Sequence, residues 1–326
     1  MSLTEDIKTK ALELGFDLVG ITDAAPIDTA DVESLTHWLE ADCAGRMSYM
    51  HRNLQKRINP AQLLKGAQSV ICLGLNYNPP KVQQKSARTN TPHGKVAAYA
   101  RYEDYHHFIK KRQCKLIDFI SSLVGTGFKF KVCVDSAPLA ERALAGRAGV
   151  GFIGKNRMLI NPELGPYILL GEIITSLKLK TDEPIKNACS DCNKCINACP
   201  TKALSAEGCL DARKCISYLT IEYKGQIPLD LARRMGNWLF GCDECILACP
   251  YHDDAPLCRS KQFRFYNDRA VLDLHRILQM TQKDFESVFA DSPLKRLGLS
   301  ALKRNAQICL TNTTSGPKNQ PSISTN

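Results

Sequence analysis

The sequence predicts an α/β domain followed by a cysteine-rich module and C-terminal helices, along a chain of 326 residues. Three observations predict this class. Strand-like and helical patterns alternate up to about residue 180, cysteines then recur at short spacings between Cys189 and Cys249, and two helical patterns follow at residues 268–289 and 293–310. The length is sufficient for two domains, or for one large domain with an added module.

Each element of the first part has a local signal. Ser2 and Glu5 have the spacing of a capping box, and the helical pattern after them ends at Gly15. The run QSVICLGL at residues 68–75 has the continuous apolar content of a buried strand. We further expect strands at 17–22, 96–102 and 128–134, helices at 31–41 and 103–122, a mobile loop at 81–95 and a hairpin that turns at 161–165.

Composition divides the chain into four expected units. These are an α/β domain at residues 1–180, the cysteine-rich module at 181–258, C-terminal helices at 259–312 and a disordered tail at 313–326. A charged stretch at 178–187 marks the first linker, and the polar, low-complexity composition of the tail predicts its disorder.

The cysteine module contains two spaced runs. Cys189, Cys192, Cys195 and Cys199 precede Pro200 as CxxCxxCxxxCP, and Cys242, Cys245 and Cys249 precede Pro250 as CxxCxxxCP. The first run is typical of bacterial ferredoxins, in which three cysteines bind one [4Fe-4S] cluster and the fourth binds the other. The pair of runs therefore predicts a ferredoxin-like module with two [4Fe-4S] clusters.

Two cubane clusters need eight thiolates, and the two runs supply seven. Cys209 and Cys215 lie between them. We assign Cys215, because aromatic and β-branched residues follow it, whereas Cys209 follows a turn-like Ala-Glu-Gly. With the ferredoxin crossover, one cluster takes Cys189, Cys192, Cys195 and Cys249, and the other takes Cys199, Cys215, Cys242 and Cys245.

Structural zinc and disulfides are the alternatives for these cysteines, and both fit poorly. Zinc sites favour paired CxxC or Cys/His sets, and disulfides require an oxidising compartment. The N-terminal sequence lacks a secretory signal, and no apolar stretch approaches the roughly 20 residues that span a bilayer. We therefore expect a cytoplasmic protein that does not enter a membrane and whose other seven cysteines stay reduced.

The formal net charge of +10 favours anionic partners, of which nucleic acid is the commonest large one. The charge occurs in short clusters, such as Lys110 to Arg112, Arg233 with Arg234, and Lys295 with Arg296. Solvated helix faces produce the same clusters, so charge alone leaves both interpretations open.

Asp135 is the first candidate for chemistry. It follows the expected strand at 128–134, and Pro138 should begin the next helix, so Asp135 stands at a strand end where ligands commonly bind in open α/β sheets. A simple helix cap is an equal alternative.

The glycines at 149–154 match neither a dinucleotide-binding fingerprint nor a P-loop. Tyr102 to His107 form a second polar cluster, able to relay protons or merely to start a helix.

Several passages resemble one known family. They are VDSAPLAERALAGRAGVGFIGKNRMLINPELG, CSDCNKCINACPTKAL, LDARKCISYLTIE, MGNWLFGCDECILACPYHDDAP and LKRNAQICL, and they are similar to passages of epoxyqueuosine reductases. The likeness extends from the first helix to about residue 312.

The resemblance implies reduction of epoxyqueuosine to queuosine in the tRNA anticodon loop. It implies cobalamin as a cofactor, reduced through the two [4Fe-4S] clusters by an unidentified donor, with the reduced cobalt acting on an epoxide carbon. Asp135 matches the proton donor, for which a pKa raised by burial against the corrin would be needed. A DxHxxG box for base-off binding through histidine is absent, because Ile109 stands where the glycine would be.

The resemblance also implies binding residues. Those expected near the corrin are Arg57, Asp135, Lys155, Met158, Ser217, Gly241 and Cys242. Those expected near the tRNA are Tyr102, His106, Lys224, Arg233 and Arg234. We expect a monomer. A cobalamin-dependent reductive dehalogenase and a non-catalytic ferredoxin-type electron carrier are the competing interpretations.

Overall fold

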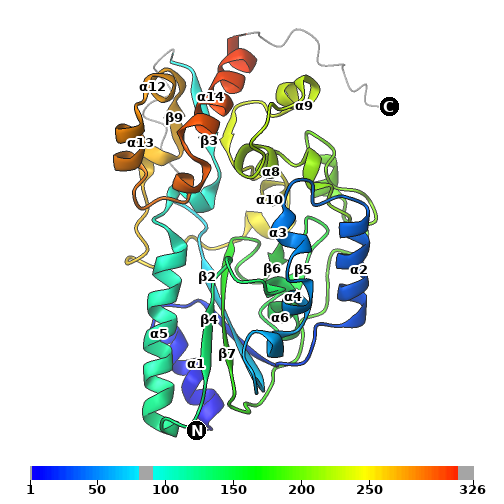
Figure 1. Cartoon of the computed structure of the whole chain (residues 1–326), viewed down its shortest axis with the longest axis vertical. Helices are drawn as coiled ribbons and strands as arrows, with labels where there is room; N and C mark the ends of the chain where they lie inside the picture. Colours follow the sequence, from blue (N-terminus) through cyan, green and yellow to red (C-terminus); the bar gives the residue numbers. More distant parts are fainter. Residues whose placement is uncertain (1, 81–90, 315–326) are drawn as a thin grey trace.

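The computed structural model describes residues 2–80 and 91–314. Its centre is a sheet in the order β1-β2-β7-β4, formed by Leu18–Asp23, Ser69–Asn76, Ile168–Thr175 and Phe130–Cys133 (Figure 1). Every neighbouring pair in this sheet is antiparallel. The first unit is therefore an α+β arrangement, and the alternation in the sequence does not reflect parallel βαβ units.

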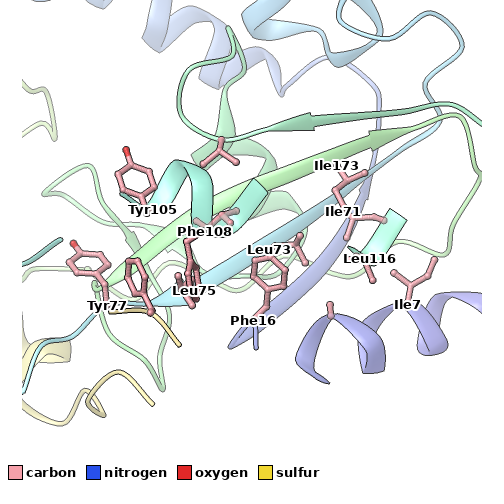
Figure 2. Close-up of a cluster of buried hydrophobic side chains, with 14 of the residues drawn as sticks. Ile7, Phe16, Ile71, Leu73, Leu75, Tyr77, Tyr105, Phe108, Leu116 and Ile173 are labelled. Carbon is pink, nitrogen blue, oxygen red and sulfur yellow. The ribbon is translucent and has the colours of Figure 1, made fainter. Parts of the chain in front are cut away.

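Two helical layers cover this sheet. Helices α1 (Leu3–Glu13) and α5 (Tyr105–Val124) pack on one face, where Ile7, Ile71, Leu73 and Leu116 are buried (Figure 2). Helix α6 (Glu141–Arg147) packs on the other face over Val70, Cys72 and Ile174. The side chains of successive β2 residues thus point to opposite faces of the sheet, and both faces are buried. This explains why the β2 sequence is apolar throughout. The helices α2 (Thr29–Glu40), α3 (Ser48–His51) and α4 (Leu54–Ile58), with η1 (Pro60–Gln62), complete this part.

A second sheet joins the expected units. Strand β3 (His93–Val96) pairs in parallel with β8 (Trp238–Phe240) and antiparallel with β9 (Val271–Asp273). Its strands come from the expected α/β domain, cysteine module and C-terminal region, so the boundaries predicted near residues 180 and 258 are crossed by this sheet. The predicted strand at 96–102 is wrong, because β3 ends at Val96 and the alanine-rich chain turns into η2 (Ala98–Arg101). Residues 81–90 of the predicted loop lie outside the described part.

The expected hairpin is displaced by a few residues. Strands β5 (Phe152–Ile153) and β6 (Leu159–Ile160) pair with each other, and β7 pairs with β2 and β4 instead. Residues 161–165 close a small bridge of their own, because the Asn161 side chain accepts hydrogen bonds from the backbone of Glu163 and Leu164.

Short helices make up the cysteine module: α7 (Lys194–Asn197), η3 (Ala212–Lys214), α8 (Ile216–Ile221), α9 (Leu229–Arg234), α10 (Glu244–Leu247) and α11 (Pro250–Asp253). The C-terminal pattern at 268–289 is divided into η4 (Asn267–Arg269), β9, α12 (Leu274–Gln279) and α13 (Gln282–Val288). The side chains of Asp273 and Thr281 cap new helices and so interrupt it.

The last elements are η5 (Pro293–Leu297) and α14 (Leu299–Thr314). Helix α14 continues to Thr314, which corrects the predicted start of the tail at 313, and residues 315–326 are outside the described part. Across residues 2–80 and 91–314, no helix combines the length and the apolar character that a membrane span requires.

Asn305 of α14 provides a test of how the units are joined. Its Nδ2 donates hydrogen bonds to the carbonyl oxygens of Thr220 in α8 (2.9 Å) and Leu239 in β8 (3.0 Å), and its side chain is fully buried. We predict that Asn305→Ala lowers the free energy of unfolding by about 3 kcal/mol, because buried carbonyls lose their donor. Denaturant unfolding of the reconstituted protein measures this. Substitution of the exposed Gln307 by alanine is the control, and an equal loss in both variants would contradict the prediction.

Candidate active site and cluster ligands

A cavity of about 510 Å³ lies where the α+β unit, the cysteine module and the C-terminal segment meet. Its lining comes from all three: Tyr49, Tyr99, Asp104, Tyr105, His106, Asp135, Ile221, Glu222, Phe240, Ser292, Pro293, Lys295 and Arg296. The lining combines charged and polar side chains with aromatic rings. A ligand with both a flat apolar face and hydrogen-bonding groups matches such a surface.

Asp135 is held in an unusual backbone conformation within this cavity. Its φ is 55°, in the left-handed region that residues other than glycine seldom adopt. Its backbone N–H donates to Glu141 Oε1 at 2.6 Å, and Tyr105 Oη donates to Asp135 Oδ2 at 2.8 Å. These bonds aim the carboxylate into the cavity, although helix α6 begins only at Glu141 and not at Pro138 as expected. Asp135 therefore lies in a loop and is not the N-cap of this helix.

His106 lies between two carboxylates. Its Nδ1 is 2.7 Å from Asp104 Oδ1, and its Nε2 is 3.4 Å from Asp135 Oδ2. Burial opposes the charged imidazolium, but the hydrogen bonds to Asp104 and Asp135 outweigh burial and raise the pKa of His106 to about 9. This imidazole is protonated at neutral pH.

The same contacts affect Asp135. Burial favours its neutral form, but hydrogen bonds from His106 and Tyr105, and the positive charge of Arg296, keep its pKa below the usual value. The rise that the sequence analysis required for a proton donor is thus not present in the protein alone. The proton of this hydrogen-bonded group is held by His106.

The cysteines expected to bind clusters lie close to one another in the fold. The thiols of Cys189, Cys192, Cys195 and Cys249 influence one another electrostatically, and Cys215 is close to Cys199, Cys242 and Cys245. Helices α7 and α10, which carry Cys195 and Cys245, pack together. Cys209 is exposed and lies instead beside Cys43.

Within the described residues, no three or more His, Cys, Asp or Glu side chains converge as ligands of a single metal ion. The four thiolates of a cubane each bind a different iron, so they need not converge on one point. Burial raises the pKa of Cys242 and Cys245, and the positive charge of bound iron would offset this effect.

Known proteins are similar to this chain over most of its length. The family model described as epoxyqueuosine reductase QueG, DUF1730, matches residues 57–136, and a 4Fe-4S double cluster binding domain matches residues 188–252. The epoxyqueuosine reductase of Vibrio cholerae is 38% identical over 97% of this chain and 85% of its own length. This chain belongs to the epoxyqueuosine reductase family.

Two solved structures of the family are also similar. An epoxyqueuosine reductase with an epoxyqueuosine-modified tRNA-Tyr stem loop has a TM-score of 0.88 and 30% identity, over 96% of this chain and 82% of that one. The Bacillus subtilis enzyme, with its catalytic aspartate loop swung out of the active site, has a TM-score of 0.87 and 29% identity, with the same coverage.

The residues expected near a corrin have different positions in this family member. Arg57 has features expected of a ligand-binding residue. Its guanidinium lies 3.5 Å from the carbonyl oxygen of Tyr49, which lines the cavity, and its buried Nε has no hydrogen-bond partner among the described residues. Ser217 lies one turn before Ile221 of the lining, and Gly241 and Cys242 follow Phe240. Lys155 is directed to the cluster segment, where its Nζ donates to Asn193 Oδ1 at 3.0 Å. Met158 packs against the hydrophobic core under helices α1 and α5, which Cys245 also contacts.

The residues expected near tRNA also differ. Tyr102 is a correction, because its ring is 1% exposed and stacks on Phe263 at 4.5 Å, which leaves no surface for a substrate. The Lys224 ammonium donates hydrogen bonds to the carbonyl oxygens of Ile221 and Leu297, and so links α8 to η5. Arg233 and Arg234 are exposed at the end of α9, and His106 lines the cavity.

Sequence reasoning missed several lining residues. Arg296 Nη1 is 4.0 Å from Asp135 Oδ2, and its other nitrogen pairs with Glu222. Tyr49 and Tyr99 were also missed, whereas Asp104 and Tyr105 belong to the polar cluster that the sequence indicated. The Lys295-Arg296 charge cluster was the only signal for Arg296, and nothing local in it indicates a neighbour 161 positions earlier.

The environment of His106 predicts a pH dependence of stability. Because its pKa is raised in the folded state to about 9, its contribution is fully present below the unfolded value of about 6.5 and is lost as pH rises through 9. We expect the stability difference between the wild type and His106→Gln to shrink between about pH 6 and about pH 10. Denaturant unfolding across this range measures it. The exposed His107→Gln is the control, and a difference that does not change with pH would refute the assignment.

Proposed function

We propose that this chain reduces epoxyqueuosine to queuosine in the anticodon loop of tRNA. The observation that carries the proposal is the group formed by Asp135, Tyr105 and His106, which opens into a cavity bordered by the cysteine segments. A longer relative with a similar fold, of which this chain covers 82%, has been solved with an epoxyqueuosine-modified tRNA stem loop. Acid groups next to an electron-transfer module suit a reductive opening of an epoxide.

Two [4Fe-4S] clusters would be held by the two cysteine sets, with Cys215 as the eighth ligand. Their proximity in the fold supports this allocation, because each set joins distant parts of the sequence around one centre. The crossover places the clusters next to each other, as Cys245 of one set is also close to Cys195 of the other. Electrons can then pass from cluster to cluster within the module.

Cobalamin fits the cavity region by one specific observation. The orphaned Nε of Arg57 is a buried donor that a ligand acceptor, such as a corrin side-chain amide, would satisfy. Ser217 lies one turn before the lining residue Ile221, and Gly241 and Cys242 follow the lining residue Phe240. Lys155 and Met158 belong to the α+β unit, where Lys155 contacts Asn193 of the module and Met158 packs against the same hydrophobic cluster as Cys245. Bound there, cobalamin would supply a reduced cobalt able to attack an epoxide carbon.

The protein's own contribution is the supply of protons. Conversion of an epoxide to an alkene consumes two electrons and two protons and releases water. Asp135 is ionised in the protein alone, but a bulky ligand that excludes water would raise its pKa, since burial already acts in that direction. One proton can then move from His106 Nε2 to Asp135 Oδ2 and on to the oxygen that leaves the substrate, and the second follows by the same route after solvent has reprotonated His106.

The tRNA would be held mainly through its phosphates. Arg233 and Arg234 are exposed cations on α9, and Lys295 and Arg296 bring positive charge to the rim of the cavity. Single-stranded loops can present an unstacked base to such a pocket. We infer that the Asp135 loop can also leave the site, as the corresponding loop does in the Bacillus subtilis relative.

The proposed acid predicts a severe activity loss in Asp135→Asn. Because an amide cannot donate the required proton, we expect turnover to fall on the order of a hundredfold or more. The test is anaerobic incubation of reconstituted protein with cobalamin, a strong reductant and epoxyqueuosine-containing tRNA, followed by mass analysis of the nucleosides. The loss of one oxygen atom identifies queuosine.

Other results of this assay would replace the proposal. If the wild type binds cobalamin and clusters but leaves epoxyqueuosine intact, a dehalogenase-type reaction on a small molecule becomes the better explanation. If the wild type binds no corrin, the interpretation as a non-catalytic electron carrier is the one that remains. If Asp135→Asn retains full turnover, the proton comes from another group.

The ligand allocation predicts different outcomes for two neighbouring cysteines. Cys215→Ala should reduce the iron content from about eight to about four atoms per chain, because one cubane loses a ligand. Cys209→Ala is the matched control and should retain about eight. Iron and sulfide analysis after anaerobic reconstitution measures both, and the reverse pattern would show that Cys209 is the ligand.

A further inference from the structure

Glu172 is a buried acid that the proposed reaction does not use. It lies in β7, in register with Cys72 of β2 and Cys133 of β4, and its exposed fraction is 0%. Helix α6 covers this face of the sheet. Treated as a carboxylate, Glu172 has two oxygens without a hydrogen-bond partner among the described residues. An unpaired buried charge of this kind is strongly unfavourable, so the group must hold a proton or a cation.

Glu141 is the side chain that can provide Glu172 with a hydrogen-bond partner. The two carboxyl groups lie within hydrogen-bonding reach of each other. Burial and the neighbouring negative charge of Glu141 raise the pKa of Glu172, which places the proton on Glu172. With one proton between them, Glu172 donates to Glu141, and one of its two oxygens without a partner gains one. Burial raises the pKa of Glu141 to about 7, so above this pH the pair carries a single negative charge, on the less buried Glu141.

Glu141 also accepts a hydrogen bond from the Asp135 loop. Its Oε1 accepts the Asp135 backbone N–H at 2.6 Å, at the residue whose φ is 55°. In the same turn, the Ser136 N–H approaches the Val134 carbonyl at 2.5 Å. A strained turn of this kind persists only when the surrounding structure holds it. Arg57 and Arg142 are the nearby cations, and neither donates a hydrogen bond to Glu172 in the described structure.

We propose that Glu141 and Glu172 share one proton and together form a latch that holds the Asp135 loop in the cavity. Glu172 is then a positioning residue, which acts on the acid through Glu141 and the Asp135 backbone without touching the substrate. The inference rests on the proposed function only for its effect on turnover. The latch itself is a property of the folded chain.

Two substitutions of Glu172 separate the latch from simple packing. Glutamine keeps the shape and donates a hydrogen bond to Glu141 through its amide, whereas alanine removes the donor. We expect Glu172→Ala to increase amide hydrogen exchange at residues 134–137 by about tenfold and to lower kcat on the order of a hundredfold, with the KM for tRNA little changed. Glu172→Gln should stay within about threefold of the wild type in both measurements. Glu163→Ala, at an exposed position, is the control.

The shared proton has its own spectroscopic test. The wild type should show an infrared carboxylic-acid carbonyl band at about pH 9, well above the raised pKa of Glu141 of about 7, and Glu172→Gln should lack it. Absence of this band in the wild type would overturn the proposal, as would unchanged exchange in Glu172→Ala or equal damage in the glutamine and alanine variants.

Should Glu172→Ala fail to fold, Glu141→Ala provides the second variant. It removes the acceptor of the Asp135 N–H while leaving Glu172 free to stay neutral, and the latch requires faster exchange at the same amides. Exchange and the infrared band are measured without substrate. If the latch is present but the wild type does not convert epoxyqueuosine, the failure therefore belongs to the proposed function and not to the latch.

Discussion

The pairing of β3 with both β8 and β9 is the constraint on which the site depends. This short sheet draws the cysteine module and the C-terminal segment onto the α+β unit, and the cavity lies at their junction. Polar contacts secure the same junction: the Ala98 N–H donates to the buried Asp243 at 2.7 Å, one residue from Cys242. The position of the acid residues relative to the proposed cluster ligands therefore depends on this sheet.

The electrostatics of the cavity follow from where the carboxylates are placed. Asp104 and Asp135 flank His106, and Arg296 arrives from the C-terminal segment to balance them. Hydrogen bonding lowers the pKa of Asp135 and raises that of His106, so the proton is stored one group away from the acid that faces the cavity. Filling the cavity strengthens the one influence that opposes this order, which is burial. Ligand binding and proton placement are coupled for that reason.

The sequence predicts what depends on local patterns. The capping pair Ser2 and Glu5, the apolar run of β2 and the cysteine spacing each act within a few residues, and all correspond to the structure. The choice of Cys215 over Cys209 stays a prediction: Cys209 is exposed, whereas Cys215 lies near Cys199, Cys242 and Cys245. The antiparallel order of the sheet, the burial of Tyr102 and the approach of Arg296 to Asp135 depend on contacts between distant segments. No spacing rule within one segment could reveal them.

Strand β8 links the cavity to the cluster ligands over a short stretch of chain. Phe240 lines the cavity, Gly241 follows it with a φ of 68°, and Cys242 comes next. A Cβ at Gly241 would lie 2.5 Å from that of Ala97, so only glycine allows the chain to turn this close to η2. Two residues span at most about 7 Å, and the proposed ligand therefore lies very near the cavity wall. Electrons delivered through Cys242 would arrive beside the group that stores the proton, as a reduction coupled to protonation requires.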